Sequence, residues 1–103
     1  MFKTVQKGAK AAITLFHEPS CKISQSIASS IHRTFPDPKA AGVDIEITDS
    51  PPTTDQLRTI TSIDRSITAK DFKRPLLVDW FDGKLAKDES TAAKILTAIG
   101  GKL

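Results

Sequence analysis

Apolar residues recur along this chain with two different periods, which separate expected strands from expected helices. Residues 12–16 form a short β-rich run that the polar segment 17–20 closes, so we expect a buried strand there. From Ser20 onwards the spacing changes to one apolar residue in four, as on one face of an amphipathic helix. That face comprises Ile23, Ile27, Ile31 and Phe35. Ser20 is the expected N-cap of this helix, which places Cys21 in its first turn.

The middle of the chain predicts a second strand and a second helix. Pro36-Asp37-Pro38 ends the first helix, and residues 43–47 then alternate apolar with acidic side chains, as a half-exposed strand does. Thr53 and Gln56 have the spacing of a capping box, which predicts the start of a second helix. The polar stretch 64–73 predicts no element.

The last third of the chain predicts a hairpin followed by a helix. We expect a strand over residues 75–81, a turn at Asp82-Gly83 and a return strand over residues 84–87. The final helix has helical spacing of its apolar residues, and Gly100-Gly101 is its expected end. These apolar residues are Ala92, Ile95, Leu96 and Ile99.

The expected order is β-α-β-α-β-β-α, which defines an α/β fold with a central mixed four-stranded sheet flanked by helices. Two β-α-β steps predict parallel strands joined by right-handed crossovers, and the hairpin adds an antiparallel edge strand. This order resembles the thioredoxin-like fold. We expect a basic N-terminal segment over residues 1–11 and a single domain over residues 12–103.

Composition narrows the classes of function. A chain of 103 residues and 11.2 kDa has room for one core. Its net charge of +3 is spread along the chain, so we expect no nucleic-acid partner. No apolar run approaches the ~20 residues that a membrane-spanning helix needs, so we expect no membrane insertion. The single cysteine, Cys21, excludes an intrachain disulfide and a multi-cysteine metal site, and we expect no bound metal.

The N-terminus carries a possible targeting signal. Residues 1–12 contain no acidic residue and three lysines, at positions 3, 7 and 10. This composition fits a mitochondrial transit peptide, and the alternative is a frayed or short helical N-terminus. The expected location is mitochondrial, with the cytoplasm as the alternative.

Cys21 is the candidate catalytic residue. At a helix N-terminus, unpaired backbone N–H groups and the helix dipole stabilise a thiolate. Ser24 completes a Cys-x-x-Ser motif, so a hydroxyl able to hydrogen-bond the thiolate replaces a resolving cysteine. The preceding His17 is either an ion-pair partner of the thiolate or a structural side chain. Pro75, if its bond to Arg74 is cis, brings its backbone beside the helix terminus that carries the cysteine.

Three segments resemble known families. Residues 13–24 (ITLFHEPSCKIS) resemble the active-site segment of glutaredoxin-coupled arsenate reductases, and residues 50–57 resemble their segment after the second strand. Residues 73–79 (KRPLLVD) resemble the Arg-Pro strand of that family and of the related thiol-stress transcription regulators of Gram-positive bacteria. A fungal family of mitochondrial redox proteins with a thioredoxin-like fold is similar over most of residues 11–99.

The resemblance implies an oxyanion site. Arsenate reductases hold their oxyanion with three arginines beside the cysteine. Arg74 matches the arginine of the Arg-Pro motif, Lys87 stands where a second arginine is expected, and Arg65 is the candidate for the third. Lysine lacks the bidentate fork of arginine, so this difference weakens specificity for tetrahedral anions.

Two functions remain open. In the first, the protein is a monothiol oxidoreductase that acts on a small-molecule electrophile or oxyanion, without a bound cofactor. Because the chain has no resolving cysteine, an external thiol such as glutathione, or glutaredoxin, is then the reductant. In the second, the protein is a catalytically inactive binding or regulatory module that keeps the same scaffold.

Overall fold

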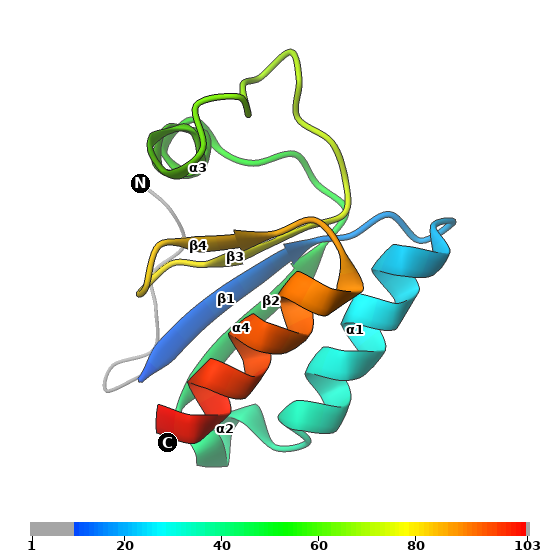
Figure 1. Ribbon diagram of the computed structural model, residues 1–103, viewed down its shortest axis with the longest axis vertical. Helices are drawn as coiled ribbons and strands as arrows, with labels where there is room; N and C mark the ends of the chain where they lie inside the picture. The colour runs from blue at the N-terminus through cyan, green and yellow to red at the C-terminus, as the bar shows by residue number, and fades with distance from the viewer. Residues whose placement is uncertain (1–9, 103) are drawn as a thin grey trace.

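The computed structural model describes residues 10–102 and arranges them around a four-stranded mixed sheet flanked by helices (Figure 1). The strands are β1 (Ala11–Phe16), β2 (Val43–Thr48), β3 (Leu76–Asp79) and β4 (Lys84–Ala86). The helices are α1 (Lys22–Thr34), α2 (Pro38–Ala41), α3 (Thr54–Ile63) and α4 (Glu89–Lys102). The expected α/β order is therefore present, with the short α2 added between α1 and β2.

The strand order is β2-β1-β3-β4, and β1 and β2 are its parallel pair. β3 runs antiparallel to β1, and β4 runs antiparallel to β3. The expectation of two parallel β-α-β steps is right for the first step and wrong for the second. Phe16 pairs with both Thr48 and Leu76, so β2 ends and β3 begins at the same end of the sheet. The connection through α3 returns the chain to that end, which reverses the direction of β3.

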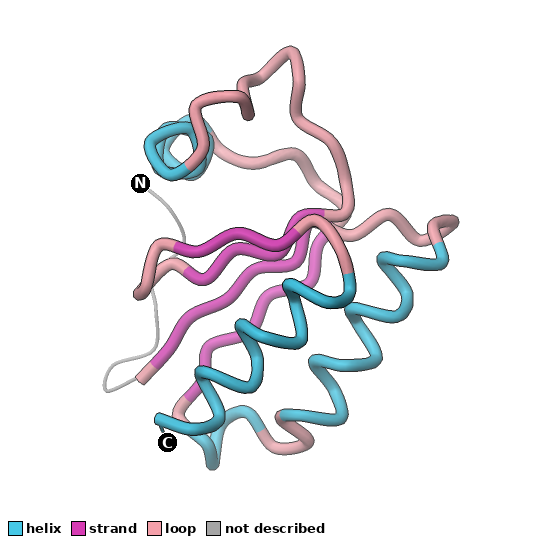
Figure 2. Tube along the Cα trace, in the orientation of Figure 1, coloured by secondary structure: helices cyan, strands magenta, loops and turns pink. Residues whose placement is uncertain are grey.

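The two faces of the sheet are covered by different helices (Figures 1 and 2). α1 and α4 lie side by side on one face, where Leu15 and Leu77 belong to the larger hydrophobic cluster. α3 lies on the other face, where Phe16 and Leu76 belong to a second cluster with Ile60. Neighbouring strand residues therefore supply opposite cores, as the two-residue period of a strand requires.

The start of α1 differs from the expectation by one residue. Cys21 is the N-cap, in extended conformation, because the Ser20 hydroxyl donates to the Glu18 carboxylate (3.2 Å) instead of capping the helix. Ile27, Ile31 and Phe35 are buried as predicted, whereas Ile23 is 44% exposed. Ile23 belongs to the first turn of α1, which Figure 1 shows projecting beyond the end of the sheet.

Short sequence motifs predicted the start of α3, the β3–β4 turn and the end of α4. The capping box is confirmed, since the Thr53 hydroxyl accepts from the Gln56 N–H (3.1 Å) and the Gln56 side chain accepts from the Thr53 N–H (2.9 Å). Gly83 has a φ of 65° in the β3–β4 turn, where glycine is favoured. The expected end of the last helix at Gly100-Gly101 is wrong: α4 continues to Lys102, because neither glycine adopts a positive φ.

These observations do not test the expected basic N-terminal segment. Residues 1–9, which hold most of the expected basic segment, lie outside the described residues, and β1 begins at Ala11. Within residues 10–102, no helix is long and apolar enough to cross a bilayer.

Candidate functional site

Cys21 lies between β1 and α1, where the chain enters the helix. Its N–H donates to the Glu18 carbonyl (3.0 Å), and its own carbonyl accepts from the Gln25 N–H (3.0 Å). The side chain is half-buried and makes no capping hydrogen bond. The first turn of α1 contains no acidic residue. The unpaired N–H groups of the first turn and the helix dipole therefore favour a negative charge at the thiol position.

Ser24 fixes the loop that carries Cys21. Its side chain is fully buried, and its Oγ accepts from the Glu18 N–H (2.9 Å) and lies 2.5 Å from His17 Nδ1. Neither of these two bonds involves Cys21. The hydrogen bond from Ser24 to the Cys21 sulfur that the sequence suggested is therefore not among the bonds formed by residues 10–102. The Gln25 side chain adds a bond to the Pro19 carbonyl (2.6 Å). These bonds hold the loop against the first turn of α1.

Sheet pairing brings Arg74 and Pro75 to the same end of the sheet as the Cys21 loop. Phe16 ends β1 and pairs with Leu76, which begins β3. The residues on either side of this pair, His17 and Pro75, therefore leave the sheet at one edge. The Arg74–Pro75 peptide bond is cis.

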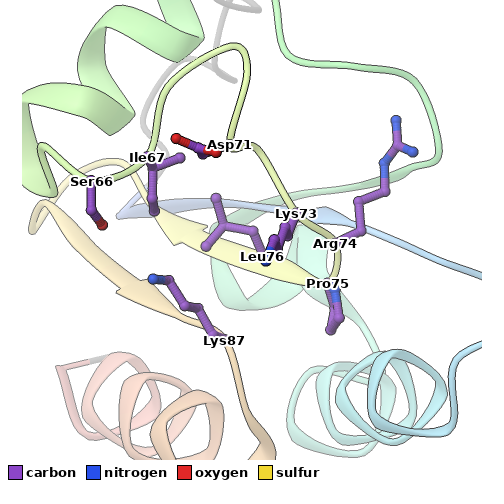
Figure 3. Close-up of a pocket in the computed structure, with 8 residues that line it drawn as sticks. All are labelled: Ser66, Ile67, Asp71, Lys73, Arg74, Pro75, Leu76 and Lys87. Carbon is purple, nitrogen blue, oxygen red and sulfur yellow. The ribbon is translucent and has the colours of Figure 1, made fainter.

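A cavity of about 400 Å³ contains two of the three expected cations (Figure 3). It is lined by Ser66, Ile67, Asp71, Lys73, Arg74, Pro75, Leu76 and Lys87. Figure 3 shows the Lys87 side chain reaching toward Ser66 and Ile67, whereas the Arg74 guanidinium points away from Lys87. The Nε atom of Arg74 is buried and has no hydrogen-bond partner among residues 10–102. The two cations share the cavity, but their charged groups do not converge.

Of the other candidates for the anion site, Lys87 forms an ion pair and Arg65 lies outside the cavity. Lys87 Nζ lies 3.5 Å from Asp64 Oδ2. Hydrogen bonds from the Ser66 hydroxyl and N–H, together with the Lys87 ammonium, hold the pKa of the Asp64 carboxyl below its ordinary value. Arg65 is exposed in the segment after α3 and does not line the cavity. The structure therefore does not assemble the three cations that the sequence suggested.

A second cavity, of about 490 Å³, lies beside the Lys73-Arg74 segment. Glu18 and the loop after β2 contribute to it, so it adjoins the Cys21 loop. Its walls are Glu18, Pro51, Pro52, Leu57, Ala69, Phe72, Lys73 and Arg74. Lys73 and Arg74 line both cavities. No sequence pattern indicated Lys73 or this cavity, because the loop residues around Lys73 follow no helical or strand period.

Residues 2–71 match a family described as "Protein of unknown function (DUF1687)". The chain belongs to this family. The match includes Cys21 and Ser24 and ends before Arg74, so it covers one of the two segments that form the site. No curated protein and no solved structure is significantly similar to the chain.

The site of this DUF1687 protein offers thiol and cation chemistry. Cys21 is a free, half-buried cysteine, and Lys73 and Arg74 line both cavities. Within residues 10–102, no group of three or more His, Cys, Asp or Glu side chains is placed to hold a metal ion.

Proposed function

We propose that this DUF1687 protein is a monothiol oxidoreductase with a thioredoxin-like domain, in which Cys21 attacks a small electrophile. The observation that carries the proposal is the position of Cys21 as the N-cap of α1, with no acidic residue in the first turn. A thiol at a helix N-terminus is a reactive thiol because the thiolate is favoured there. The half-buried side chain remains accessible to a small substrate.

The sheet supports the thioredoxin-like assignment. The order β2-β1-β3-β4 has a parallel pair on one side of β1 and antiparallel strands on the other. α1 and α4 share one face, and α3 covers the opposite one (Figure 1). A cysteine between the first strand and the first helix, with Arg74-Pro75 at the same end of the sheet, has the arrangement that the sequence resemblance implies.

With an oxyanion or a peroxide as substrate, the reaction requires two external thiols for each turnover; a mixed disulfide requires one, because attack by Cys21 already forms the mixed disulfide on Cys21. The Cys21 thiolate attacks the electrophilic atom of the substrate and forms a covalent adduct. A first thiol then attacks the adduct, which leaves a mixed disulfide on Cys21 and releases the reduced product. A second thiol attacks this mixed disulfide, releases the Cys21 thiolate and leaves as the oxidised disulfide. The two thiols supply two electrons, and an oxygen lost by the substrate leaves as water. Glutathione fits this role because the chain has no second cysteine.

Lys73 and Arg74 determine which charge is favoured on the electrophile. They place two cations in a cavity that adjoins the Cys21 loop, where Glu18 is the acidic lining residue. An anionic substrate is therefore favoured over a cationic one. Arsenate is a weaker candidate than an anion with simpler geometric demands. A tetrahedral oxyanion suits the bidentate fork of arginine, and Arg74 is the single arginine that lines the two cavities.

Turnover by the Cys21→Ser variant tests the proposal. Purified protein is incubated with glutathione and, in separate assays, with arsenate, hydrogen peroxide or a glutathione mixed disulfide, and formation of oxidised glutathione is followed. We expect turnover with wild type and none with Cys21→Ser, whose circular dichroism stays that of wild type. Ser26→Ala, on the same helix, is the control and keeps its activity. Turnover by Cys21→Ser overturns the proposal.

The pairing of Lys87 with Asp64 favours a second candidate, a non-catalytic binding or regulatory module. The Asp64 carboxylate lowers the positive charge that Lys87 offers to an oxyanion. This candidate predicts that no substrate is turned over and that a defined protein partner binds wild type and Cys21→Ala with equal affinity. Turnover that depends on Cys21 contradicts it.

We further propose a mitochondrial location, with the cytoplasm as the alternative. The basis is the basic, acid-free composition of residues 1–12. The full chain with a C-terminal fluorescent tag is compared with a variant whose three N-terminal lysines are glutamines. Mitochondrial import of wild type and loss of import in the variant support the proposal, and equal distribution of the two contradicts it.

A further inference from the structure

Most of the residues that line the second cavity are apolar. Its volume is about 490 Å³, and its apolar wall residues come from the loop after β2, from α3 and from the loop before β3. They are Pro51, Pro52, Leu57, Ala69 and Phe72. A bare inorganic oxyanion has no apolar surface, so it would leave these walls in contact with water. A ligand with an apolar body removes them from water, which favours binding.

The fold holds these apolar walls in place. The Phe72 ring packs edge-on against the buried Phe16, with the ring centroids 5.3 Å apart. Leu57 lies at the start of α3, where its N–H donates to the Thr53 carbonyl (2.9 Å). The cavity is therefore largely preformed, so a ligand does not lose affinity by ordering it.

Two cations give the same cavity a polar side. Lys73 and Arg74 follow Phe72 in the chain and line the cavity with it. The buried Nε–H of Arg74 has no acceptor among residues 10–102. A carboxylate is the planar acceptor that matches the guanidinium fork. A molecule with an apolar body and one carboxylate therefore matches both kinds of wall.

The cavity adjoins the thiol through one residue. Glu18 belongs to its wall, and the Glu18 carbonyl accepts from the Cys21 N–H (3.0 Å). The Glu18 carboxylate accepts from the Ser20 hydroxyl (3.2 Å). A ligand in this cavity therefore lies beside the loop that presents the half-buried Cys21.

The reacting group of the ligand has to suit a site without a clamp for oxyanions. Figure 3 shows that the charged groups of Arg74 and Lys87 do not converge. The –O–O–H group of an organic hydroperoxide is compact and neutral, so a thiolate can attack it without several converging cations.

We propose that the substrate is an organic hydroperoxide whose apolar body lies against Leu57 and Phe72 and whose carboxylate pairs with Lys73 and Arg74. This inference rests on the proposed function, because it names the substrate class of the same site.

The reaction balances with the external thiols of the proposed function. The Cys21 thiolate attacks the terminal oxygen of the hydroperoxide, so an S–O bond forms and the O–O bond breaks. The alkoxide leaves, takes a proton from water and becomes an alcohol, and Cys21 becomes a sulfenic acid. A first glutathione releases water and forms a mixed disulfide, and a second restores the thiolate and leaves as oxidised glutathione.

Turnover of three peroxides with glutathione tests the proposal. They are hydrogen peroxide, cumene hydroperoxide and ring-carboxylated cumene hydroperoxide, and each kcat/KM is divided by the rate constant of the uncatalysed reaction with glutathione. We expect the normalised value to rise at least about tenfold from the first to the second, because the second has an apolar body. The carboxylate adds a gain of up to about fivefold, as one exposed ion pair does. No rise from the first to the second, or no gain from the carboxylate, overturns the proposal.

Leu57→Gln tests the apolar wall. Glutamine is also a good helix former, and within residues 10–102 Leu57 is not a member of either hydrophobic cluster. We expect the ratio of kcat/KM for cumene hydroperoxide to that for hydrogen peroxide to fall about tenfold. Ile63→Gln is the matched control, because Ile63 is also half-buried in α3 but lines a different cavity, and it keeps the wild-type ratio. Equal ratios in the two variants overturn the proposal.

Lys73→Gln tests the pairing with the carboxylate. We expect it to lose most of the gain that the carboxylated hydroperoxide has over cumene hydroperoxide. Lys70→Gln, exposed in the same loop and lining neither of the two cavities, makes the same change in net charge and keeps the gain. Equal losses in the two variants show an effect of net charge and overturn the pairing.

A binding measurement separates this inference from the proposed function. The probe is para-isopropylbenzoate, which has the apolar body and the carboxylate but no peroxide, and its affinity is measured by calorimetric titration. We expect wild type to bind it more tightly than inorganic phosphate, and Leu57→Gln to bind it about tenfold more weakly than Ile63→Gln. Binding no tighter than that of phosphate overturns this inference. Binding as expected, without Cys21-dependent turnover of any substrate, overturns the proposed function.

Discussion

The Lys87 ammonium lies 3.5 Å from the Asp64 carboxylate, and Lys87 also lines the cavity that it shares with Arg74. This pair joins the segment after α3 to the residue after β4. The carboxylate competes with any anion that enters the cavity. The charge available for binding is therefore lower than the number of cations in the wall suggests.

Asp64→Asn is expected to increase the affinity of the protein for sulfate or phosphate. The change releases Lys87 from its partner, and the gain is at most about fivefold, because a solvent-exposed ion pair contributes roughly 0–1 kcal/mol. Protection of Cys21 from alkylation and calorimetric titration both measure it.

Asp55→Asn is the matched control for this prediction. Asp55 also forms an ion pair, with Arg58 on the exposed side of α3 (3.1 Å), and its removal changes the net charge equally. Equal gains in affinity for the two variants would show that net charge, and not release of Lys87, is the cause.

Acid is expected to weaken the fold through Asp64 and Asp88. Both carboxyls have a pKa below the ordinary 3.8, chiefly because of hydrogen bonds from Ser66 and from the Thr91 N–H respectively. A lowered pKa contributes stability above 3.8 that is lost as the pH falls through the folded-state value. Urea unfolding at pH values above and below this range measures the loss.

Asp88→Asn isolates one of these contributions. The amide oxygen still accepts from the Thr91 N–H, which bonds Asp88 Oδ1 at 2.7 Å in wild type, but it does not titrate. The acid-induced fall in unfolding free energy is therefore smaller in Asp88→Asn than in wild type or in the exposed control Asp49→Asn. An identical fall in all three proteins contradicts the assignment.

Two apolar positions on neighbouring elements are expected to differ sharply in their effect on stability. Leu15 is fully buried between the sheet and its helices, so Leu15→Ala costs about 2–5 kcal/mol of unfolding free energy. Ile23 is 44% exposed, so Ile23→Ala changes the unfolding free energy by less than about 0.5 kcal/mol. Chemical denaturation measures both. A large loss in Ile23→Ala would mean that this residue packs against the core.

The capping box predicts a contrast between adjacent threonines. Thr53→Ala removes the acceptor of the Gln56 N–H and costs about 1 kcal/mol of unfolding free energy. Thr54, the first residue of α3, is exposed, and Thr54→Ala changes it by less than about 0.5 kcal/mol. Equal losses in denaturation experiments would show that the box does not stabilise α3.

Local patterns predicted the elements well and the direction of one strand badly. The four-residue period of α1 and the capping box of α3 are properties of short segments, so the sequence contains them fully. The direction of β3 depends on where the chain leaves α3, which involves the unpatterned residues 64–75. The helix α2 had local signals, with Asp37 as N-cap and Gly42 at a φ of 76°, but it spans four residues without an apolar period.

The candidate site was predictable in its main residues and not in their partners. Cys21, Arg74 and Pro75 belong to recognisable motifs, and the register of β1 and β3 brings these motifs to one end of the sheet. The bond from Ser24 to His17 and the pairing of Lys87 with Asp64 join residues whose separation in space no sequence pattern encodes. The use of Lys73 in both cavities follows only from the fold of the loop before β3.

The central claim is that Cys21 is a reactive thiolate beside a site for anions. The most direct test is the pH dependence of its alkylation by iodoacetamide, with and without phosphate, sulfate or arsenate. The account predicts a midpoint below about pH 7 that changes when an oxyanion is present. A midpoint at or above about pH 8.5, or no reaction of the folded protein, would contradict it and leave the scaffold as a binding module.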